Sequence, residues 1–341
     1  MADNGVVLKR VGVVVRDLAT AQAAYEKYLG ITDWATAEYP AEALRDVRAA
    51  NGRETTGAYR SAIGRWGAAE GVVFELVEPI SGETPFNEYL LTKGPGIAWL
   101  TVVDKDPSNP NTLASRLTGL GIAVSNSWET AEGRREFWDT RDALGGYLLE
   151  VADPAAADPI APNAADATSP LPFTQVFHFG VIVNNVMKAN EAYHAIFGIT
   201  EFPIKAWNAE MGRLDSPQYR GKSVEHGYFT SQGMCENFGF EIIETTYGDS
   251  HYNREFSDRR GPGIHHVYAW MAKDENEWVA TIDTMTGLGA PICMGSPLRG
   301  GAAEFAYFDT AELGFLIEGV IRRRPAEPQY QAPDWVVTFH G

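Results

Sequence analysis

Hydrophobic residues follow two different periods at the start of the chain. The run VGVVV at residues 11–15 is apolar and has polar residues on both sides, which is typical of a buried strand. After it, apolar residues recur every three or four positions as far as Leu29, which is the spacing of one helix face. Asp17 is placed to cap this helix, and Gly30 is placed to end it. The pattern predicts a strand and a helix, followed by strands that end with VVFELVEP at 72–79.

The second quarter of the chain repeats this order. The apolar run IAWLTVV at 97–103 predicts a strand, and leucines at helical spacing predict a helix within residues 111–120. Further strands follow and end with YLLEVAD at 147–153. Each of these two quarters therefore predicts one β-α-β-β-β unit.

An internal repeat relates the two halves of the chain. The stretch RVGVVVRDLATAQAAYEKYLGITDW, from Arg10, aligns without gaps with HFGVIVNNVMKANEAYHAIFGITEF, from His178. Three further pairs are GPGIAWLTVVD with GPGIHHVYAW, FELVEP with FEIIET, and FWDTRDALGGYLLEV with AYFDTAELGFLIEGV. Such a repeat indicates two copies of one architecture. We therefore predict an α+β fold of four β-α-β-β-β units in two domains.

The repeat and the local composition also set the domain boundaries. The repeated halves span residues 1–152 and 173–325. Residues 153–172 are rich in Ala, Pro and Asp and have no pattern that builds a packed face, which predicts a linker. Residues 326–341 fall outside the repeat and form a C-terminal tail.

The composition limits the classes of protein to consider. The chain has 341 residues, a formal net charge of −17 and two cysteines. The negative charge opposes binding to nucleic acid and to anionic membranes. No apolar run approaches the roughly 20 residues that cross a bilayer, and the first residues lack the apolar stretch of a signal peptide. We therefore expect a cytoplasmic protein with reduced cysteines, whose partner is a small molecule.

Four polar side chains stand at equivalent strand positions in the second half. They lie in the first and last strands of units three and four, as His178, Glu241, His266 and Glu318. Because strand side chains alternate between faces, all four can point away from the helices. Two imidazoles and two carboxylates in one concavity are costly unless paired, and a divalent Fe, Mn, Co, Ni or Zn ion removes that cost. We predict one divalent metal ion there and regard His265, on the opposite strand face, as a bystander.

The first half lacks this set of ligands. Its equivalent positions carry Arg10, Glu75, Trp99 and Glu150, so both glutamates persist and both histidines are absent. An arginine beside two carboxylates forms a salt-bridged cluster instead of a metal site. All seven histidines of the chain lie after the predicted linker. We therefore predict that the first domain supports the second and binds no metal.

These sequences resemble the vicinal oxygen chelate superfamily, which includes glyoxalase I, methylmalonyl-CoA epimerase, extradiol dioxygenases and bleomycin-resistance proteins. The resemblance rests on HFGVIVNNVMKANEAYHAIFGI, FGFEIIE, GPGIHHVYAW and YFDTAELGFLIE, with their first-half copies. It implies two glyoxalase-like domains with curved, cup-shaped mixed sheets, in which the first and last strands of the units supply the metal ligands. The His-Glu-His-Glu set is similar to that of bacterial glyoxalase I. Units three and four have to pair with each other to complete it, and the repeat also leaves a homodimer open.

The resemblance and the ligand set leave three functions open. The first is a glyoxalase- or epimerase-like isomerase, epimerase or lyase, in which the metal stabilises an enolate of a small carbonyl substrate and Glu241 or Glu318 is the base. The second is an extradiol-type ring-cleaving dioxygenase, which uses two histidines and one carboxylate, so that Glu241 counts against it. The third is a metal-free small-molecule binding or resistance protein. We expect the first.

Candidate substrate contacts in the second half are aromatic or cationic. The side chains expected to line the site are Trp207, Tyr228, Tyr268, Trp270 and Arg299. The aromatic residues would supply an apolar wall, and the arginine would meet an acidic group of the substrate.

Overall fold

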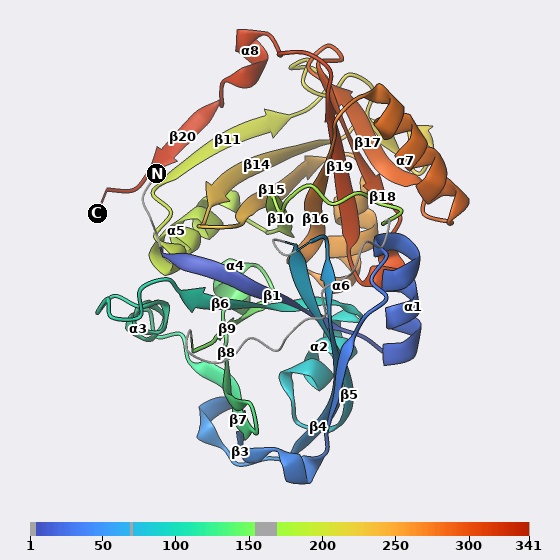
Figure 1. The fold of residues 1–341 in the computed structure, drawn as a ribbon. Helices are drawn as coiled ribbons and strands as arrows, with labels where there is room; N and C mark the ends of the chain where they lie inside the picture. Colours follow the sequence, from blue (N-terminus) through green and yellow to red (C-terminus); the bar gives the residue numbers. More distant parts are fainter. Residues whose placement is uncertain (1–4, 69–70, 154–168, 341) are drawn as a thin grey trace.

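Each half of the chain forms one curled sheet (Figure 1). The structure is a computed structural model that describes residues 5–68, 71–153 and 169–340. The elements of the first half are β1 (Val6–Val14), α1 (Leu18–Leu29), β2 (Ala35–Tyr39), η1 (Ala41–Ala43), β3 (Arg45–Arg48), η2 (Ala50–Gly52), β4 (Gly57–Trp66), β5 (Val72–Gly82), α2 (Pro85–Lys93), β6 (Gly96–Asp104), α3 (Leu113–Gly119), β7 (Val124–Thr130), β8 (Gly133–Trp138), α4 (Arg141–Leu144) and β9 (Leu148–Val151).

The second half follows the same order with more elements near its edges. They are β10 (His178–Ile182), α5 (Val186–Phe197), β11 (Glu201–Trp207), β12 (Gln218–Tyr219), β13 (Lys222–Ser223), β14 (Gly227–Met234), β15 (Gly239–Tyr247), the π-helix η3 (His251–Ser257), α6 (Asp258–Arg260), β16 (Gly263–Ala272), α7 (Glu275–Gly287), β17 (Ile292–Leu298), β18 (Ala303–Phe308), η4 (Ala311–Leu313), β19 (Leu316–Arg322), α8 (Pro328–Gln331) and β20 (Trp335–Thr338).

The strand order confirms the four predicted units. The first sheet runs β2-β4-β5-β1-β6-β9-β8-β7-β3, and the second runs β13-β12-β17-β18-β19-β16-β10-β15-β14-β11-β20. In the second sheet β10 pairs antiparallel with β16, while β15 and β19 pair parallel to β10 and β16. In the first sheet β1, β6, β5 and β9 repeat this arrangement. Units three and four therefore pair with each other, as the ligand set required.

The ends of the first helix of each half form where the sequence signals place them. The Asp17 side chain accepts a hydrogen bond from the Thr20 backbone N–H at 2.7 Å, which caps α1. Asn185 caps α5 in the same way. Gly30 and Gly198 end these helices with φ values of 68° and 72°, a left-handed conformation that glycine adopts without steric cost.

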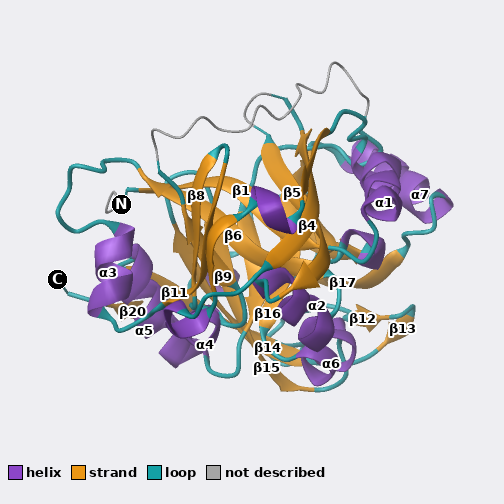
Figure 2. Cartoon of the chain, turned by 90° about the horizontal axis from the view of Figure 1, so that it is seen from below, coloured by secondary structure: helices purple, strands orange, loops and turns teal. Residues whose placement is uncertain are grey.

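Helices cover two opposite sides of the molecule. Figure 2 shows α3, α4 and α5 together on one side and α1 and α7 on the other. Each helix cluster joins the two halves. On one side the phenol oxygens of Tyr147 and Tyr193 lie 3.0 Å apart, and on the other the Tyr25 hydroxyl donates to the Leu313 carbonyl at 3.0 Å. One buried hydrophobic cluster accordingly includes residues of both halves.

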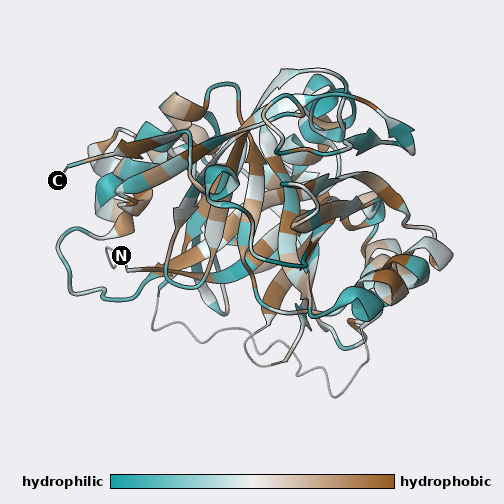
Figure 3. Cartoon of the chain, turned by 90° about the horizontal axis from the view of Figure 1, so that it is seen from above, coloured by the Kyte–Doolittle hydropathy of each residue, from teal (hydrophilic) through white to brown (hydrophobic). Residues whose placement is uncertain are grey.

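Hydrophobic residues concentrate along the central strands, while loops are mostly hydrophilic (Figure 3). Among the described residues, no helix combines the length and the hydropathy needed to span a membrane.

Two segments lie outside the repeat, the predicted linker and the C-terminal tail. Most of the predicted linker, residues 154–168, lies outside the described residues. The segment that follows is anchored, because Leu171 is buried and its carbonyl accepts a hydrogen bond from the Trp66 indole at 3.3 Å. The C-terminal tail adds β20 to the edge of the second sheet beside β11.

Candidate metal centre

The four predicted ligands gather on the central strands of the second sheet. His178 lies on β10, Glu241 on β15, His266 on β16 and Glu318 on β19, which are neighbours in the sheet. Gly180 on β10 stands opposite both Glu241 and His266 in the register of the strands. Because β10 and β15 are parallel and β10 and β16 antiparallel, equivalent positions of units three and four meet at the same level of the sheet.

These side chains point to the face of the second sheet that is turned away from α5 and α7. We call it the cup face. Its buried apolar lining is Ile182, Trp207, Leu214, Tyr228, Ile243, Tyr252, Phe256, Cys293, Met294, Leu298, Phe305, Tyr307 and Leu316. This cluster is separate from the main core beneath the helices, so the ligands lie among apolar residues on a face of their own.

The donor atoms of the four ligands lie close together. The Glu318 carboxylate is 3.1 Å from Nε2 of His178 and 3.3 Å from Nε2 of His266. The two Nε2 atoms are 3.3 Å apart. The Glu241 carboxylate is farther away, at 3.6 Å from His178 and 3.7 Å from His266. Three donors therefore form a tight group, and Glu241 stands at its side.

A glycine makes room for one of the ligands. A Cβ atom at Gly180 would lie 1.8 Å from the imidazole of His266, which is far inside van der Waals contact. The imidazole therefore lies directly over the backbone of β10. In the first sheet Gly12 plays the same part for Trp99, whose ring would lie 1.9 Å from an added Cβ. The glycine shared by both repeats thus allows a ring at this position in each domain.

The donor set fits one divalent metal ion. One ligand atom from each of His178, Glu241, His266 and Glu318 can be chosen so that all lie within 4.8 Å of one another. At most 9% of any of these residues is exposed, so water cannot compensate the carboxylates. Imidazole nitrogen and carboxylate oxygen together suit Fe, Mn, Co, Ni or Zn. The chemistry of the donors therefore supports the predicted cofactor.

The two carboxyl groups of the site differ in their electrostatic environment. Burial would raise the pKa of Glu318, but hydrogen bonds from His178 and His266 outweigh it and lower the pKa to about 2. Burial raises the pKa of Glu241 to about 7, although His178 opposes the shift. Glu318 is therefore the permanent anion of the group, and Glu241 is the carboxyl that accepts a proton more readily.

The first half carries a salt-bridged cluster at the equivalent place. Arg10 lies 3.6 Å from Glu75 and 3.5 Å from Glu150, as the sequence predicted. The stronger partner is Arg135 on β8, which sequence reasoning missed. Its guanidinium donates to Glu75 at 2.7 and 2.9 Å and to Glu150 at 2.5 and 2.9 Å. A guanidinium therefore compensates the two carboxylates that a metal would compensate in the second half.

A signal for Arg135 is present in the sequence. FW at 137–138 aligns with YF at 307–308, which places Arg135 opposite Phe305 in the repeat. Phe305 belongs to the cup face. An arginine that replaces an inward-facing phenylalanine in the half without histidines marks a buried cation.

Four of the five predicted substrate contacts lie near the ligands or along the adjacent wall of the cup face. The Tyr268 ring lies 5.1 Å from the His178 ring, and Trp207 and Tyr228 stack at 6.3 Å on the cup face. The guanidinium of Arg299 lies 5.1 Å from the Trp207 ring, so it reaches the same wall. The structure thus brings these four residues to the side of the sheet that holds the ligands.

Trp270 lies on the other side of the sheet, so we remove it from the predicted substrate contacts. It is fully buried in the main core, stacks on Trp278 of α7 at 5.3 Å and donates to Glu277. The cause is a β-bulge between Tyr268 and Trp270, which breaks the alternation that would have put both on one face.

A second irregularity on the same strand changes the role of His265. The register of β16 shifts where Gly180 and Val181 pair with His266 and Ile264, so His265 is the extra residue. Its ring packs against Tyr252 and Tyr307 of the cup face at 4.9 and 5.4 Å. The expectation that His265 falls on the opposite face is therefore wrong, and it lies directly behind His266.

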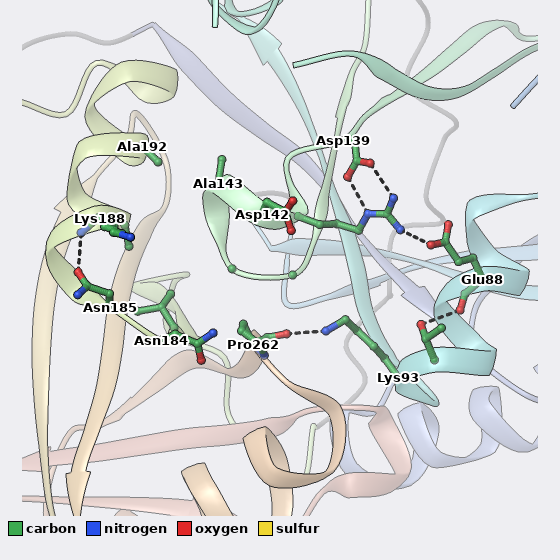
Figure 4. A pocket seen from close by; sticks show the side chains of 16 residues that line it. Glu88, Lys93, Asp139, Asp142, Ala143, Asn184, Asn185, Lys188, Ala192 and Pro262 are labelled. Atoms are coloured by element: carbon green, nitrogen blue, oxygen red, sulfur yellow. Dashed lines mark hydrogen bonds and ion pairs between the residues drawn. The ribbon is translucent and has the colours of Figure 1, made fainter. Parts of the chain in front are cut away.

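A separate cavity lies at the junction of the two halves (Figure 4). It has a volume of about 740 Å³ and is bordered by α2, α4 and the start of α5. Its charged groups are largely satisfied within the chain. Arg141 pairs with Asp139 and Glu88, and Lys93 donates to the carbonyls of Arg260 and Pro262 at 2.8 Å. None of the predicted ligands borders this cavity.

No protein-family model and no curated protein matches the sequence, whereas solved structures match the fold. A triple mutant of 4-hydroxymandelate synthase from Streptomyces coelicolor has a TM-score of 0.59 at 14% identity, covering 94% of this chain and 93% of that chain. A halotolerant catechol dioxygenase has a TM-score of 0.51 at 10% identity, covering 96% and 92%. A fusion of a xylose isomerase-like TIM barrel with a 4-hydroxyphenylpyruvate dioxygenase has a TM-score of 0.50 at 11% identity, covering 96% and 50%. Together with the paired β-α-β-β-β units, these likenesses show that the chain has the same two-domain fold as these proteins, which is the fold that the sequence resemblance implied.

Proposed function

We propose that the chain is a metal-dependent dioxygenase whose centre is built from His178, His266 and Glu318. The observation that carries this proposal is the tight group of two imidazole nitrogens and one carboxylate, with neighbouring donors 3.1–3.3 Å apart. Two histidines and one carboxylate are the ligands of non-haem iron oxygenases, in which they leave positions for substrate and oxygen. The similarity to a catechol dioxygenase agrees with this choice.

Glu241 is the feature that a dioxygenase of this type does not require. Its carboxyl stands outside the tight group, at 3.6 and 3.7 Å from the two histidines. In our proposal it borders the substrate instead of completing the ligand set. This favours dioxygenase chemistry over the redox-neutral reactions that the sequence first suggested.

The cup face supports a small aromatic substrate. Trp207 and Tyr228 form a stacked wall, and Tyr307 lies against the ring of His266 at 4.7 Å. The hydroxyl of Tyr268 is buried and has no hydrogen-bond partner among the described residues. A buried phenol without a partner is costly, so a polar atom of the substrate is its natural acceptor or donor.

Two cations beside this wall support an acidic group on the substrate. Lys205 shares a strand face with Trp207, over which the Arg299 guanidinium lies. Neither cation forms an ion pair in the parts of the chain that the structure describes, and the Nε atom of Arg299 is buried without a partner. Burial lowers the pKa of Lys205 to about 8, and Arg299 adds to this. A carboxylate would relieve both the burial and the repulsion.

In the proposed reaction the metal ion and the residues of the chain have separate roles. A bound ferrous ion would supply binding of the two adjacent oxygens and of O₂. The chain holds that ion through His178, His266 and Glu318, orients the ring against the aromatic wall and excludes water. Both atoms of O₂ enter the product, so the reaction needs no separate reductant.

A second candidate is the isomerase, epimerase or lyase, and one observation favours it. Glu241 brings the ligand set to four, and burial raises its pKa to about 7, which suits a general base. In this case a metal held by the four residues would supply polarisation of a carbonyl, and Glu241 or Glu318 would remove the neighbouring proton.

Oxygen uptake and proton exchange separate the two candidates. Iron-loaded protein would be offered catechol and 3,4-dihydroxybenzoate in an oxygen electrode, and α-hydroxy and α-methyl carbonyl compounds in deuterated water. We expect oxygen uptake with the carboxylated catechol, and we expect Glu241→Ala to keep both the metal and most of the uptake.

Variants at Glu241 also define the contrary result. Suppose that the wild type exchanges deuterium without taking up oxygen, and that the exchange rate falls by roughly 10²- to 10⁴-fold in Glu241→Ala. This result would establish the second candidate and overturn the first. Glu241→Gln is the matched variant, because its amide oxygen can still coordinate a metal and its shape is nearly unchanged.

A further inference from the structure

A line of buried imidazoles runs from the metal centre towards the molecular surface. Nδ1 of His266 lies 3.1 Å from Nδ1 of His265, and Nε2 of His265 lies 2.9 Å from Nδ1 of His251. Nε2 of His251 then faces the Glu255 carboxylate at 3.6 Å. The three histidines are 0%, 1% and 7% exposed, so they exchange hydrogen bonds with one another and not with bulk water.

Two irregular elements create this line. The bulge at His265 turns two successive side chains of β16 to the same side, which regular alternation forbids. The π-helix η3 carries His251 and Glu255, and η3 packs against β16. Tyr252 and Phe256, also from η3, hold the ring of His265 at 4.9 and 5.2 Å. Helices of this type occur often at functional sites.

Glu255 is held as a carboxylate at the outer end of the line. The hydroxyl of Tyr219 and Nε of Arg220 each donate to it at 2.7 Å. The hydrogen bonds from Arg220 lower the pKa of Glu255 to about 2, although burial opposes the shift. Glu255 is therefore ionised at neutral pH, and its oxygens only accept hydrogen bonds.

We propose that His265 and His251 form a relay of hydrogen bonds behind His266 that accepts the Nδ1 proton of His266 when its Nε2 binds the metal, with the Glu255 carboxylate facing the outer end. The direction follows from one donor and one acceptor on each neutral ring. With a metal on Nε2, His266 donates from Nδ1 to Nδ1 of His265, and His265 donates from Nε2 to Nδ1 of His251. His251 then carries its proton on Nε2, the nitrogen that lies 3.6 Å from the Glu255 carboxylate.

The relay makes His265, His251 and Glu255 positioning residues for the proposed metal centre, on which this inference rests. Nε2 of His266 faces Glu318 at 3.3 Å and Nε2 of His178 at 3.3 Å, where the ion would bind. Partners of this kind fix the orientation and the tautomer of a ligating histidine and raise its basicity. In the HH pair at 265–266, His266 is thus the proposed ligand and His265 is the residue that positions it.

Two readouts test the relay, the tautomer of His265 in Zn²⁺-loaded protein and the affinity for Zn²⁺. Nitrogen NMR of the Zn²⁺-loaded wild-type protein should show the proton of His265 on Nε2. His265→Phe and His251→Phe should weaken Zn²⁺ binding, measured by competition with a chelator, by roughly 10- to 100-fold. His265→Asn should keep the affinity within a few-fold, because its amide oxygen can replace Nδ1 as the acceptor.

A control variant and the contrary results separate failure of the relay from failure of the proposed function. His194→Phe changes a half-buried histidine on α5 outside the relay, so neither readout should move. Unchanged Zn²⁺ affinity in both His265→Phe and His251→Phe, or a proton on Nδ1 of His265 in the Zn²⁺-loaded wild type, would overturn the relay while leaving a wild-type dioxygenase intact. A wild-type protein that binds no metal would overturn the proposed function and, with it, the relay. Because His251 does not touch the metal ligands, its variant tests the relay even if His265→Phe fails to fold.

Discussion

At the scale of single residues, the two domains differ in how they compensate a pair of buried glutamates. Each buries two glutamates on equivalent central strands, Glu75 and Glu150 in the first domain and Glu241 and Glu318 in the second. The first domain compensates them with the guanidinium of Arg135. The second provides two imidazoles, which leave room for an ion. A buried guanidinium and a bound metal are thus alternatives at the same position of the fold.

We expect Arg135→Met to lower the free energy of unfolding by about 3–5 kcal/mol, because it leaves buried carboxylates without their main partner. Urea unfolding at pH 7.5 measures the loss. Arg134→Met is the matched control, since Arg134 is the neighbouring residue but 42% of its side chain is exposed. Its effect should stay within about 0.5 kcal/mol. Equal effects of the two substitutions would contradict the compensating role of Arg135.

The pH dependence of this variant has a definite sign. In the wild-type protein burial alone would raise the pKa of Glu150. Arg135 and Arg10 outweigh burial and lower this pKa to about 2, below the unfolded value of roughly 4.3. Its ion pairs therefore stabilise the fold above the unfolded pKa, and this contribution is lost as pH falls towards 2. Without Arg135, burial favours the protonated carboxyl, so Arg135→Met should gain stability between pH 7.5 and pH 5. A loss of stability over that interval would contradict the compensation of Glu150 by Arg135.

At the scale of elements, the repeat predicted most of what the structure contains. Periodicity indicated the strand and helix that open the units, and the alignment of Arg10 with His178 and of Trp99 with His266 indicated which positions share a face. The faces of His265 and Trp270 could not be predicted, because each depends on a bulge in β16. Bulges arise from the packing of neighbouring strands, which a single strand's pattern does not contain.

The close approach of β10 and β16 gives a prediction at this scale. Gly180→Ala should move the His266 ring, destabilise the fold by about 1–3 kcal/mol and weaken metal binding by at least roughly tenfold. Gly12→Ala meets Trp99 at nearly the same distance in the first domain, so it should cost similar stability without changing metal affinity. Calorimetry and chelator competition on both variants measure the two effects. Equal metal affinity in the two variants would show that Gly180 does not position His266.

At the scale of the whole molecule, we assign the metal to the second domain and a supporting role to the first. The helix clusters join the two halves on both sides, so we expect the first domain to stabilise the second, although arginines occupy the centre of the first. The sequence indicated this asymmetry through its histidines, all of which lie in the second half or the tail. The repeat places Arg135 opposite Phe305, but it does not indicate that Arg135 contacts Glu75, which lies 60 positions away. Nor does the sequence contain the distances that separate Glu241 from the tight group of donors.

The most direct test of this account is the metal content of the purified chain. Protein prepared without chelator should hold about one equivalent of divalent metal, the stoichiometry of a single mononuclear site. His266→Ala should hold almost none, because it removes a buried ligand from the tight group, while Trp99→Ala, its counterpart in the first domain, should keep one equivalent. Unchanged metal in His266→Ala, or two equivalents in the wild type, would contradict a single centre in the second domain.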